Sequence, residues 1–375
     1  MAGVRTVGVE EELLLVDPAT GRLRARAGAV LRAEATRDAT REDGDKGGPG
    51  GELVAELKQE QVETDTRPCA GAEELGAEIR RWRAGAAAAA ARAGVRVAAL
   101  ATSPVPVDPT TTPQPRYEQM AVDYGLTAEE QLTCGCHVHV AVDSPDEAVG
   151  VLDRIRPWLP PLQAVTANSP FWQGRDTGYA SYRSQVWDRW PTAGPAELFG
   201  DAAGYEAAVE QLLATGALLD RHMLYLDARP AEEHPTVEVR VADVCLEADD
   251  AVLHALLVRG LVETEARAWA AGASPPPVRT ETLRLARWRA GRSGLGGDLV
   301  HPVTGRPAPV GDVLDALLAH VADTLADSGD TEVVADLLAA ARARGGGAGR
   351  QRAALARTGD LAGVVLDAVG RTTPQ

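Results

Sequence analysis

The sequence predicts an α+β fold, with strands and helices interspersed up to about residue 272 and a mostly helical portion over 273–375. Segments such as TVEVRVAD (236–243) alternate apolar and polar residues, which is typical of half-buried strands. Segments such as 71–93 repeat apolar residues at helical spacing. The chain has 375 residues, 45% of them hydrophobic, which suffices for one large domain or two ordinary ones.

The first half is expected to begin with a strand over residues 4–17, which ends in the turn DPATG at 17–21. A helix over 71–93 ends before Gly94, and the strand VRVAAL (95–100) follows it directly. The other segments are a polar, glycine-rich loop at 37–51, the alternating stretch ELVAELKQEQVETDT at 52–66, and an irregular stretch with five prolines at 103–115.

The second half begins with the strand CHVHVAVD, which ends at Asp143 and precedes a helix with Ser144 as its N-cap. An aromatic segment without periodicity follows at 168–192, and the prolines at 275–277 interrupt the chain later. The remaining expected elements are the strand at 236–243, helices at 204–226, 247–271, 280–290, 311–326, 331–344 and 359–369, and a glycine-rich break at 345–349.

The charge balance excludes several classes of partner. The formal net charge is −16, whereas nucleic-acid-binding proteins carry a basic surface and anionic membranes repel an acidic protein. No run of 18 apolar residues could span a membrane. Four cysteines, and a first apolar stretch that contains three glutamates, are typical of a reduced compartment without a secretory segment. We therefore expect a cytoplasmic protein that binds small polar molecules and metal ions, with no nucleic-acid or membrane partner.

Lysine is scarce, which excludes further chemistry. Lys46 and Lys58 are the two lysines among 38 basic residues, and neither lies in the Gly-Lys-Ser/Thr sequence of a phosphate-binding P-loop. A kinase-type strand lysine is also absent. If this protein binds a nucleotide, arginine and metal ions must hold its phosphates.

Three of the expected strands carry charged residues on one face. Side chains at i and i+2 of a strand share a face, so the pairs on these faces are Glu10 with Glu12, His137 with His139, and Glu238 with Arg240. A solvated outer face is the plain interpretation, since antiparallel sheets often have one. However, glutamates brought together raise one another's pKa unless a cation lies among them. Carboxylates suit Mg²⁺, and an imidazole suits Mn²⁺ better.

The segment CGCHVH also contains the ligand types of a zinc site. Strand geometry argues against one, because Cys134 and Cys136 share one face while His137 and His139 share the other. A bulge that re-aims one pair would be needed to bring all four together.

The segment 168–190 contains six of the chain's 15 aromatic residues together with Arg175, Arg183 and Arg189. One interpretation is a loop whose aromatic side chains fill the core. The other is a rim where arginine binds phosphate or carboxylate and Trp or Tyr lines an adenine or substrate site. Arg292, directly before a glycine-rich turn, is a weaker candidate of the same kind.

Several motifs, in this order and over nearly the whole chain, resemble the carboxylate–amine ligase family, the type 2 glutamate–cysteine ligases related to glutamine synthetase. The motifs are GVEEEL (8–13), VETDTRPC (62–69), YEQMAVDYG (117–125), GCHVHV (135–140), NSPFWQGRDTGYASYR (168–183), DARPAEEHPTVEVRVAD (227–243), RSGLGG (292–297) and DLVHPVTG (298–305). The resemblance implies a curved antiparallel sheet of the glutamine-synthetase catalytic-domain type with flanking helices. It also implies that residues 1–375 form one ligase domain.

The resemblance further implies an ATP-dependent ligase that forms an amide bond through an acyl phosphate. The γ-carboxylate of glutamate would be activated for attack by cysteine or by another amine, and nothing in the sequence identifies the amine. Two alternatives stay open: a non-catalytic protein that binds ATP and metal on the same fold, and a metal-dependent hydrolase.

Site residues follow from matching the motifs residue by residue. The implied metal ligands, for Mg²⁺ or Mn²⁺, are Glu10, Glu12, Glu56, Glu63, His137 and Glu238. Arg240 would face the transferring phosphate, and Arg183 and Arg292 would lie near substrate or phosphate; His137, Arg240 and Arg292 would bind ATP. The sequence differs from the family at Ala141, where glycine is common, and in its glycine-rich loop at 41–51. Members often assemble, so we expect a homo-oligomer.

Overall fold

The structure, a computed structural model, describes residues 3–39 and 51–373. Most of the glycine-rich loop expected at 37–51 lies outside these residues, and its first part, 37–39, belongs to a helix that the sequence pattern did not predict. No helix in the described ranges is long and apolar enough to cross a lipid bilayer.

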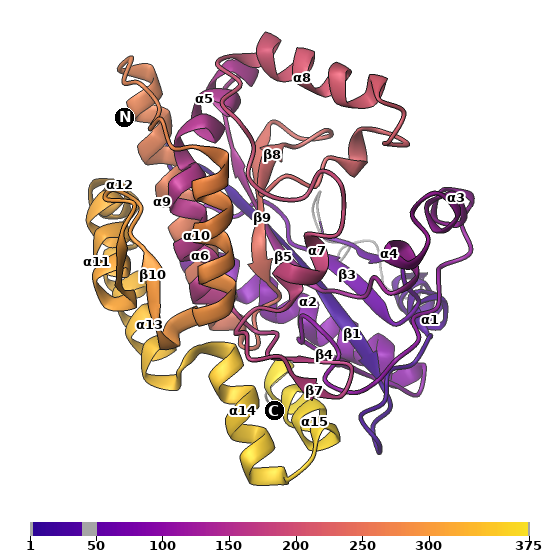
Figure 1. Cartoon of the computed structure of the whole chain (residues 1–375). Coiled ribbons are helices and arrows are strands. Elements are labelled where there is room, and N and C mark those ends of the chain that lie inside the picture. Colours follow the sequence, from indigo (N-terminus) through magenta and orange to yellow (C-terminus); the bar gives the residue numbers. More distant parts are fainter. Residues whose placement is uncertain (1–2, 40–50, 374–375) are drawn as a thin grey trace.

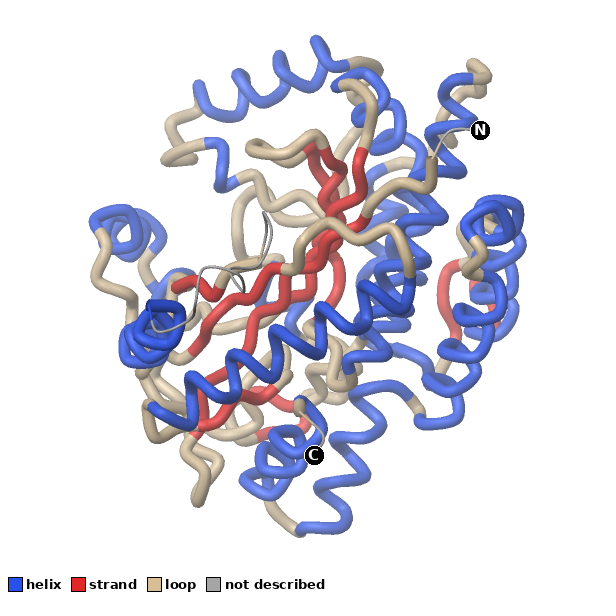
Figure 2. The backbone as a smooth tube through the Cα atoms, turned by 180° about the vertical axis from the view of Figure 1, so that it is seen from behind, coloured by secondary structure: helices blue, strands red, loops and turns tan. Residues whose placement is uncertain are grey.

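One antiparallel sheet forms the centre of the described molecule, with the strand order β2-β3-β1-β5-β9-β8 and β4 paired to β1. Figure 2 shows these strands as one twisted band that crosses the molecule between the helices. Its strands are β1 (Val7–Val16), β2 (Leu53–Ala55), β3 (Gln61–Asp65), β4 (Arg96–Ala98), β5 (Gly135–Ala141), β8 (Ala228–Pro230) and β9 (Thr236–Asp243). Two small hairpins stand apart: β6 (Phe171–Trp172) with β7 (Arg175–Asp176), and β10 (Asp298–Val300) with β11 (Pro307–Pro309).

Helices surround the sheet. In chain order they are α1 (Ala27–Ala39), α2 (Ala72–Arg92), α3 (Pro115–Tyr124), α4 (Leu126–Glu129), α5 (Pro145–Ile155), α6 (Leu159–Thr166), α7 (Arg183–Trp187), α8 (Ala202–Ala214), α9 (Ala248–Ala270), α10 (Thr280–Ser293), α11 (Val310–His320), α12 (Ala322–Ser328), α13 (Thr331–Arg344), α14 (Gly346–Thr358) and α15 (Leu361–Thr372). Figure 1 shows α5, α6 and α9 beside the sheet, with α11 to α13 outside them.

The apolar faces of the strands build the main core. Val138 and Val140 of β5 and Val237 and Val239 of β9 are fully buried and pack in one cluster with residues of α5 and α9. This is the alternation that the sequence pattern predicts. Every second side chain of a strand points into the core, and the side chains between them lie on the opposite face. The charged residues of these strands therefore lie together on that opposite face.

The C-terminal helices share apolar clusters with the strands of the sheet. Leu317 of α11, Leu325 of α12 and Leu338 of α13 are buried in the cluster that contains the β5 and β9 valines. Val365 of α15 is buried with residues of β1 and β4. This shared core supports our proposal that residues 1–375 form one domain, with an α+β part over 1–272 and a helical part over 273–375.

The structure confirms most expected elements and, besides the helix that includes residues 37–39, corrects three. The helix expected at 204–226 ends at Ala214, because Gly216 takes a left-handed φ of 70° and the chain turns away. The helix expected at 311–326 is two helices, α11 and α12, separated at Val321. The glycine-rich break expected at 345–349 is mostly helical, since α14 begins at Gly346.

Tertiary packing explains the last correction. A side chain on Gly347 would come within 2.4 Å of Asn168, so glycine here permits close contact between α14 and the segment after α6. Glycine therefore serves helix packing at this position rather than ending the helix.

Candidate active site

The strand register brings the predicted charged residues next to one another. Across the β1–β5 pair, Glu10 lies opposite His137, and across the β1–β3 pair, Glu12 lies opposite Glu63. Glu238 lies opposite His139 across the β5–β9 pair. Because directly opposed side chains on one face are about 5 Å apart at Cβ, six residues from four strands meet on one surface.

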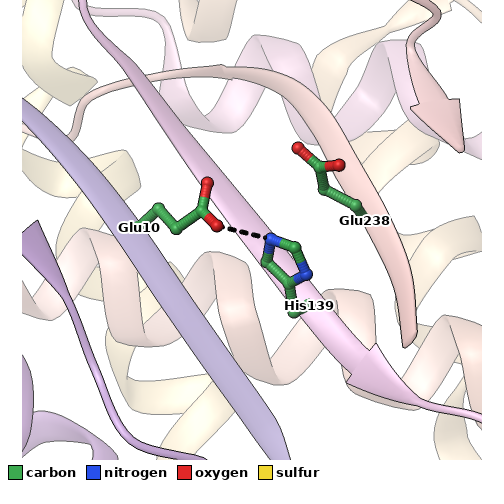
Figure 3. A group of neighbouring side chains, drawn as sticks. All are labelled: Glu10, His139 and Glu238. Carbon is green, nitrogen blue, oxygen red and sulfur yellow. Dashed lines mark ion pairs between the residues drawn. The ribbon is translucent and has the colours of Figure 1, made fainter. Parts of the chain in front are cut away.

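Glu10 is held between two imidazoles. Its Oε2 lies 3.0 Å from His137 Nδ1, and its Oε1 lies 2.8 Å from His139 Nε2. Figure 3 shows Glu10 and His139 pointing toward each other, with Glu238 on the next strand beside them. Burial opposes ionisation of Glu10, but the hydrogen bonds to His137 and His139 hold the pKa of this carboxyl well below its usual range. Burial and the positive charge of Arg240 lower the pKa of His137 to about 4, so this imidazole is neutral at physiological pH.

A second group contains Glu12, Glu56 and Glu63 at the other side of the same surface. Their carboxylate oxygens lie within 4.8 Å of one another. Burial, reinforced by the charge of Glu56, raises the pKa of Glu12 to about 7 and raises that of Glu63 well above its usual value. Carboxylates so placed share protons unless a cation replaces them.

The acidic surface fits divalent cations. Three overlapping sets have all their ligand atoms within 4.8 Å: Glu10–His139–Glu238, Glu10–Glu63–His137 and Glu12–Glu56–Glu63. Oxygen donors dominate these sets, as Mg²⁺ and Mn²⁺ require. In addition, Nε2 of His137 is buried without a hydrogen-bond partner in the described part of the chain, which leaves it free as a ligand. None of the sets found among the described residues includes a cysteine.

Arginines adjoin the carboxylates. Arg229 Nε donates to Glu238 Oε2 at 2.7 Å, and Arg240 donates to Glu238 Oε1. Although burial raises it, the pKa of Glu238 falls to about 2 because Arg240 and Arg229 favour the charged form. The Nε atom of Arg240 is buried and has no partner among the described residues, so an anion beside it could accept its proton in a hydrogen bond.

These groups line one cavity of about 540 Å³. Glu10, Glu12, Glu56, Glu63, His137, Glu238 and Arg240, seven of the nine residues predicted for the site, are in its wall. Trp187, Trp190, Tyr117 and Tyr225 form an aromatic part of the wall, and Tyr225 makes edge-to-face contacts with both tryptophans at 4.9 and 5.4 Å. The cavity therefore combines a sheet surface of carboxylates and imidazoles, arginine donors and an aromatic side.

The other two predicted residues lie elsewhere. Arg183 is buried beside the cavity, with Nη2 3.5 Å from the backbone oxygen of Arg240. Arg292 is exposed on α10, where it donates to the Gly178 carbonyl and lies over the Tyr179 ring at 5.6 Å, and it is not part of the cavity wall. The role of Arg292 in substrate or phosphate binding stays a prediction.

Sequence reasoning missed several wall residues. His139 shares a face with His137, and this alternation could have selected it as a ligand. Arg229 lies on the three-residue strand β8, which is too short to show a period. Lys58 lines the cavity but is buried, and its Nζ donates to Thr111 Oγ1 and to the Glu129 carbonyl at 3.0 and 3.1 Å.

The antiparallel sheet thus brings carboxylates, imidazoles and arginines together in one cavity, an arrangement suited to anionic substrates and divalent cations. The family description "glutamate–cysteine ligase family 2" matches residues 6–367. Proteins that carry the provisional names glutamate–cysteine ligase 2-1, from Streptomyces avermitilis, and glutamate–cysteine ligase 2, from Streptomyces coelicolor, are each 52% identical over 369 residues. Both alignments cover 98% of this chain and 99% of the relative.

Solved structures share the fold. The glutamate–cysteine ligase of Francisella tularensis, crystallised with AMP, superposes with a TM-score of 0.69 at 12% identity and covers 99% of this chain and 89% of its own. A bifunctional glutathione synthetase from Pasteurella multocida gives a TM-score of 0.66 at 15% identity, over 98% of this chain and 52% of its own. The sequence expectation of an α+β fold with a glutamine-synthetase-like sheet is confirmed.

The chain belongs to glutamate–cysteine ligase family 2. It is therefore an enzyme, an ATP-dependent carboxylate–amine ligase of the glutamate–cysteine ligase type, as the sequence motifs indicated.

Proposed function

We propose that this ligase forms an amide bond through an acyl phosphate, with the γ-carboxylate of glutamate as the activated group and cysteine or another amine as the acceptor. The observation that carries the proposal is that three overlapping sets of potential cation ligands and the Arg240 guanidinium line one cavity. ATP and Mg²⁺, or Mn²⁺, are the proposed cofactors.

The described side chains fit these cofactors. Glu12, Glu56 and Glu63 would hold one divalent cation, and Glu10, His137 and Glu238, with His139 beside them, would hold further cations. Bound cations would neutralise the negative charge that builds up on the phosphate oxygens during transfer. Arg240, whose Nε lacks a partner in the described structure, would donate to an oxygen of the transferred phosphoryl group.

The chemistry proceeds in two displacements. An oxygen of the carboxylate attacks the γ-phosphorus of ATP, and the bond to the bridging oxygen breaks so that ADP leaves with its electron pair. The amine then attacks the acyl carbon, phosphate leaves, and the proton lost by the amine passes to a base or to water. Positioning and electrostatic stabilisation provide most of the catalysis in such reactions, which is why the site needs no phosphate-binding lysine.

A coupled screen for ADP release tests the proposal. Purified protein with Mg²⁺, ATP and glutamate is offered a panel of amines that includes cysteine. We expect ADP release from ATP that requires Mg²⁺, glutamate and an accepted amine. Binding of ATP without ADP release across the panel would instead favour a non-catalytic binding protein. Hydrolysis of a substrate by the metal-loaded protein without ATP would favour a metal-dependent hydrolase.

Substitutions at the acidic surface provide the matched test. Glu12→Gln and Glu238→Gln keep the side-chain shape but remove a ligand charge, so we expect turnover to fall at least about 100-fold. Glu281→Gln, at an exposed carboxylate on α10 that is 69% accessible, is the control and should leave turnover unchanged. Full turnover in both site variants would remove these carboxylates from the proposed metal site.

The cellular setting is also proposed on the sequence and the family. We propose a cytoplasmic enzyme that acts on small molecules, without a nucleic-acid or membrane partner, and that assembles as a homo-oligomer. Light scattering during gel filtration measures the assembly directly.

A further inference from the structure

Behind the cavity, the buried carboxylate of Asp243 at the end of β9 fastens the aromatic segment to the sheet. Asp243 is 1% exposed. Its Oδ2 accepts hydrogen bonds from the backbone N–H of Asn168 at 2.8 Å and from Ser169 Oγ at 2.7 Å, and its Oδ1 accepts one from Ser181 Oγ at 2.8 Å. One carboxylate thus holds both ends of the 168–181 segment.

Arg183 follows this segment directly and depends on it for its position. Ser169 Oγ, which donates to Asp243, accepts a hydrogen bond from the Arg183 backbone N–H at 2.9 Å. The Arg183 side chain occupies the space above Gly135, the residue paired with Asp243 across the β5–β9 ladder. A Cβ at Gly135 would lie 2.5 Å from Arg183 Nη2 and 2.9 Å from His137 Nε2, so the guanidinium and the imidazole meet over this glycine.

The Arg183 guanidinium has unused donors. Its Nε is buried without a hydrogen-bond partner among the described residues, and its Nη2 lies 3.5 Å from the Arg240 carbonyl. A buried guanidinium left in this way is costly unless an anion arrives. The neighbouring His137 and Arg240 line the cavity, so an anion there would lie next to Arg183.

We propose that Asp243, through Ser169 and Ser181, is a positioning residue that holds the Arg183 guanidinium over Gly135 for contact with the phosphates of the bound nucleotide. The inference rests on the proposed function insofar as that function brings ATP into this cavity. If Asp243 only stabilised the fold, its substitution would weaken nucleotide binding equally with and without the Arg183 guanidinium. If Asp243 positions Arg183, its substitution has no further effect on nucleotide binding once the Arg183 guanidinium has been removed.

A double-mutant cycle on the full chain separates the two roles. Calorimetry measures the dissociation constant of MgATP, without carboxylate or amine, for wild type, Asp243→Asn, Arg183→Met and the double variant. We expect Asp243→Asn to weaken binding about tenfold in the wild-type background and less than twofold in the Arg183→Met background. Equal losses in the two backgrounds, or no loss in either, would overturn the inference.

Asp153→Asn is the matched control. Asp153 is also a buried carboxylate that fastens a loop, accepting from the backbone N–H groups of Phe199 and Gly200 at 2.9 and 2.8 Å, but it lies outside the cavity wall. We expect it to change MgATP binding less than twofold. If Asp243→Asn does not fold, Ser181→Ala removes a single donor and should give a smaller loss of binding that again disappears with Arg183→Met.

The outcome is separable from that of the proposed function. Wild-type protein that binds MgATP but never releases ADP would contradict the proposed ligase reaction, while the cycle on binding would still decide the role of Asp243. Wild-type protein that does not bind MgATP would overturn the positioning role itself.

Discussion

Glu12 shows how the site is electrically arranged at the scale of single residues. Its Oε2 accepts a hydrogen bond from the Gly135 backbone N–H at 2.6 Å, and the carboxylates of Glu56, directly after β2, and Glu63 of β3 lie near it. Burial disfavours the charged form of Glu12 and raises its pKa, and without a cation the like charge of Glu56 adds to the effect. The same arrangement that favours protonation of these carboxylates would also favour the binding of a divalent cation.

The raised pKa of Glu12 predicts that the stability of the folded protein depends on pH. The pKa of Glu12 is about 7 in the folded protein, against about 4.3 in an unfolded chain, so the folded form binds the proton more tightly. The stability that protonation of Glu12 adds to the folded protein is complete below the pKa that Glu12 has in the unfolded chain. It is lost as pH rises through the folded pKa of about 7. From pH 6 to pH 8, metal-free wild type should therefore lose about 1 kcal/mol of unfolding free energy relative to Glu12→Gln.

Urea denaturation of chelator-treated protein at both pH values measures this difference. With saturating Mg²⁺ the wild-type loss should disappear, because the metal replaces the proton and binds only the folded site. An identical pH dependence in wild type and Glu12→Gln would contradict the raised pKa.

At the scale of elements, strand β1 carries a charge on each of its faces. Glu11 lies among the apolar side chains of β1 and is 2% exposed. Arg83 of α2 meets it with two hydrogen bonds, from Nε at 2.8 Å and Nη2 at 2.6 Å, and also donates to the Cys245 carbonyl at 2.6 Å. The pair fixes α2 against the strand that presents Glu10 and Glu12 to the cavity.

Removal of one partner should destabilise the fold strongly. Arg83→Met leaves the Glu11 carboxylate buried and unpaired, so we expect the free energy of unfolding to fall by about 3–5 kcal/mol. Arg24→Met is the control, since Arg24 pairs with Asp17 at 2.7 Å but its side chain is 52% exposed, and it should cost less than about 1 kcal/mol. Chemical denaturation compares the two variants, and equal losses would argue against a buried pair that fixes α2.

Element patterns were predictable where the period is long enough to read. The alternation in β1, β5 and β9 identified both the core face and the charged face, including Glu10, Glu12 and Glu238. Three-residue strands such as β2 and β8 show no period, and their positions follow from pairing with neighbours. The partner of Glu11 was not predictable either, because a helix 72 residues away supplies it.

At the scale of the whole molecule, the cavity is assembled from segments that are far apart in the sequence. Glu12 of β1, Glu56 after β2, Trp187 of α7 and Arg240 of β9 all line it. Residue types and spacing identified the strand residues, including Glu63, and the family resemblance added Glu56. The aromatic side was left open between core and substrate wall, and the structure uses it for both: Phe171 is buried in a small apolar cluster, whereas Trp187 lines the cavity.

The single-domain proposal predicts cooperative unfolding of the whole chain. A chain ended at residue 272 would lose Leu317, Leu325 and Leu338 from the core shared with β5 and β9. We expect this shorter chain to lack a cooperative thermal transition and to be degraded rapidly by protease, whereas the full chain shows one transition. A stable, protease-resistant fragment 1–272 would instead indicate two domains.

Transfer of ¹⁸O from the carboxylate to phosphate tests the proposed reaction most directly. With glutamate labelled at the γ-carboxylate, Mg²⁺, ATP and an accepted amine, one labelled oxygen should appear in each inorganic phosphate released, because the carboxylate oxygen that attacked phosphorus leaves with it. Mass spectrometry of the phosphate gives the result. Amide formation with unlabelled phosphate would contradict activation through an acyl phosphate.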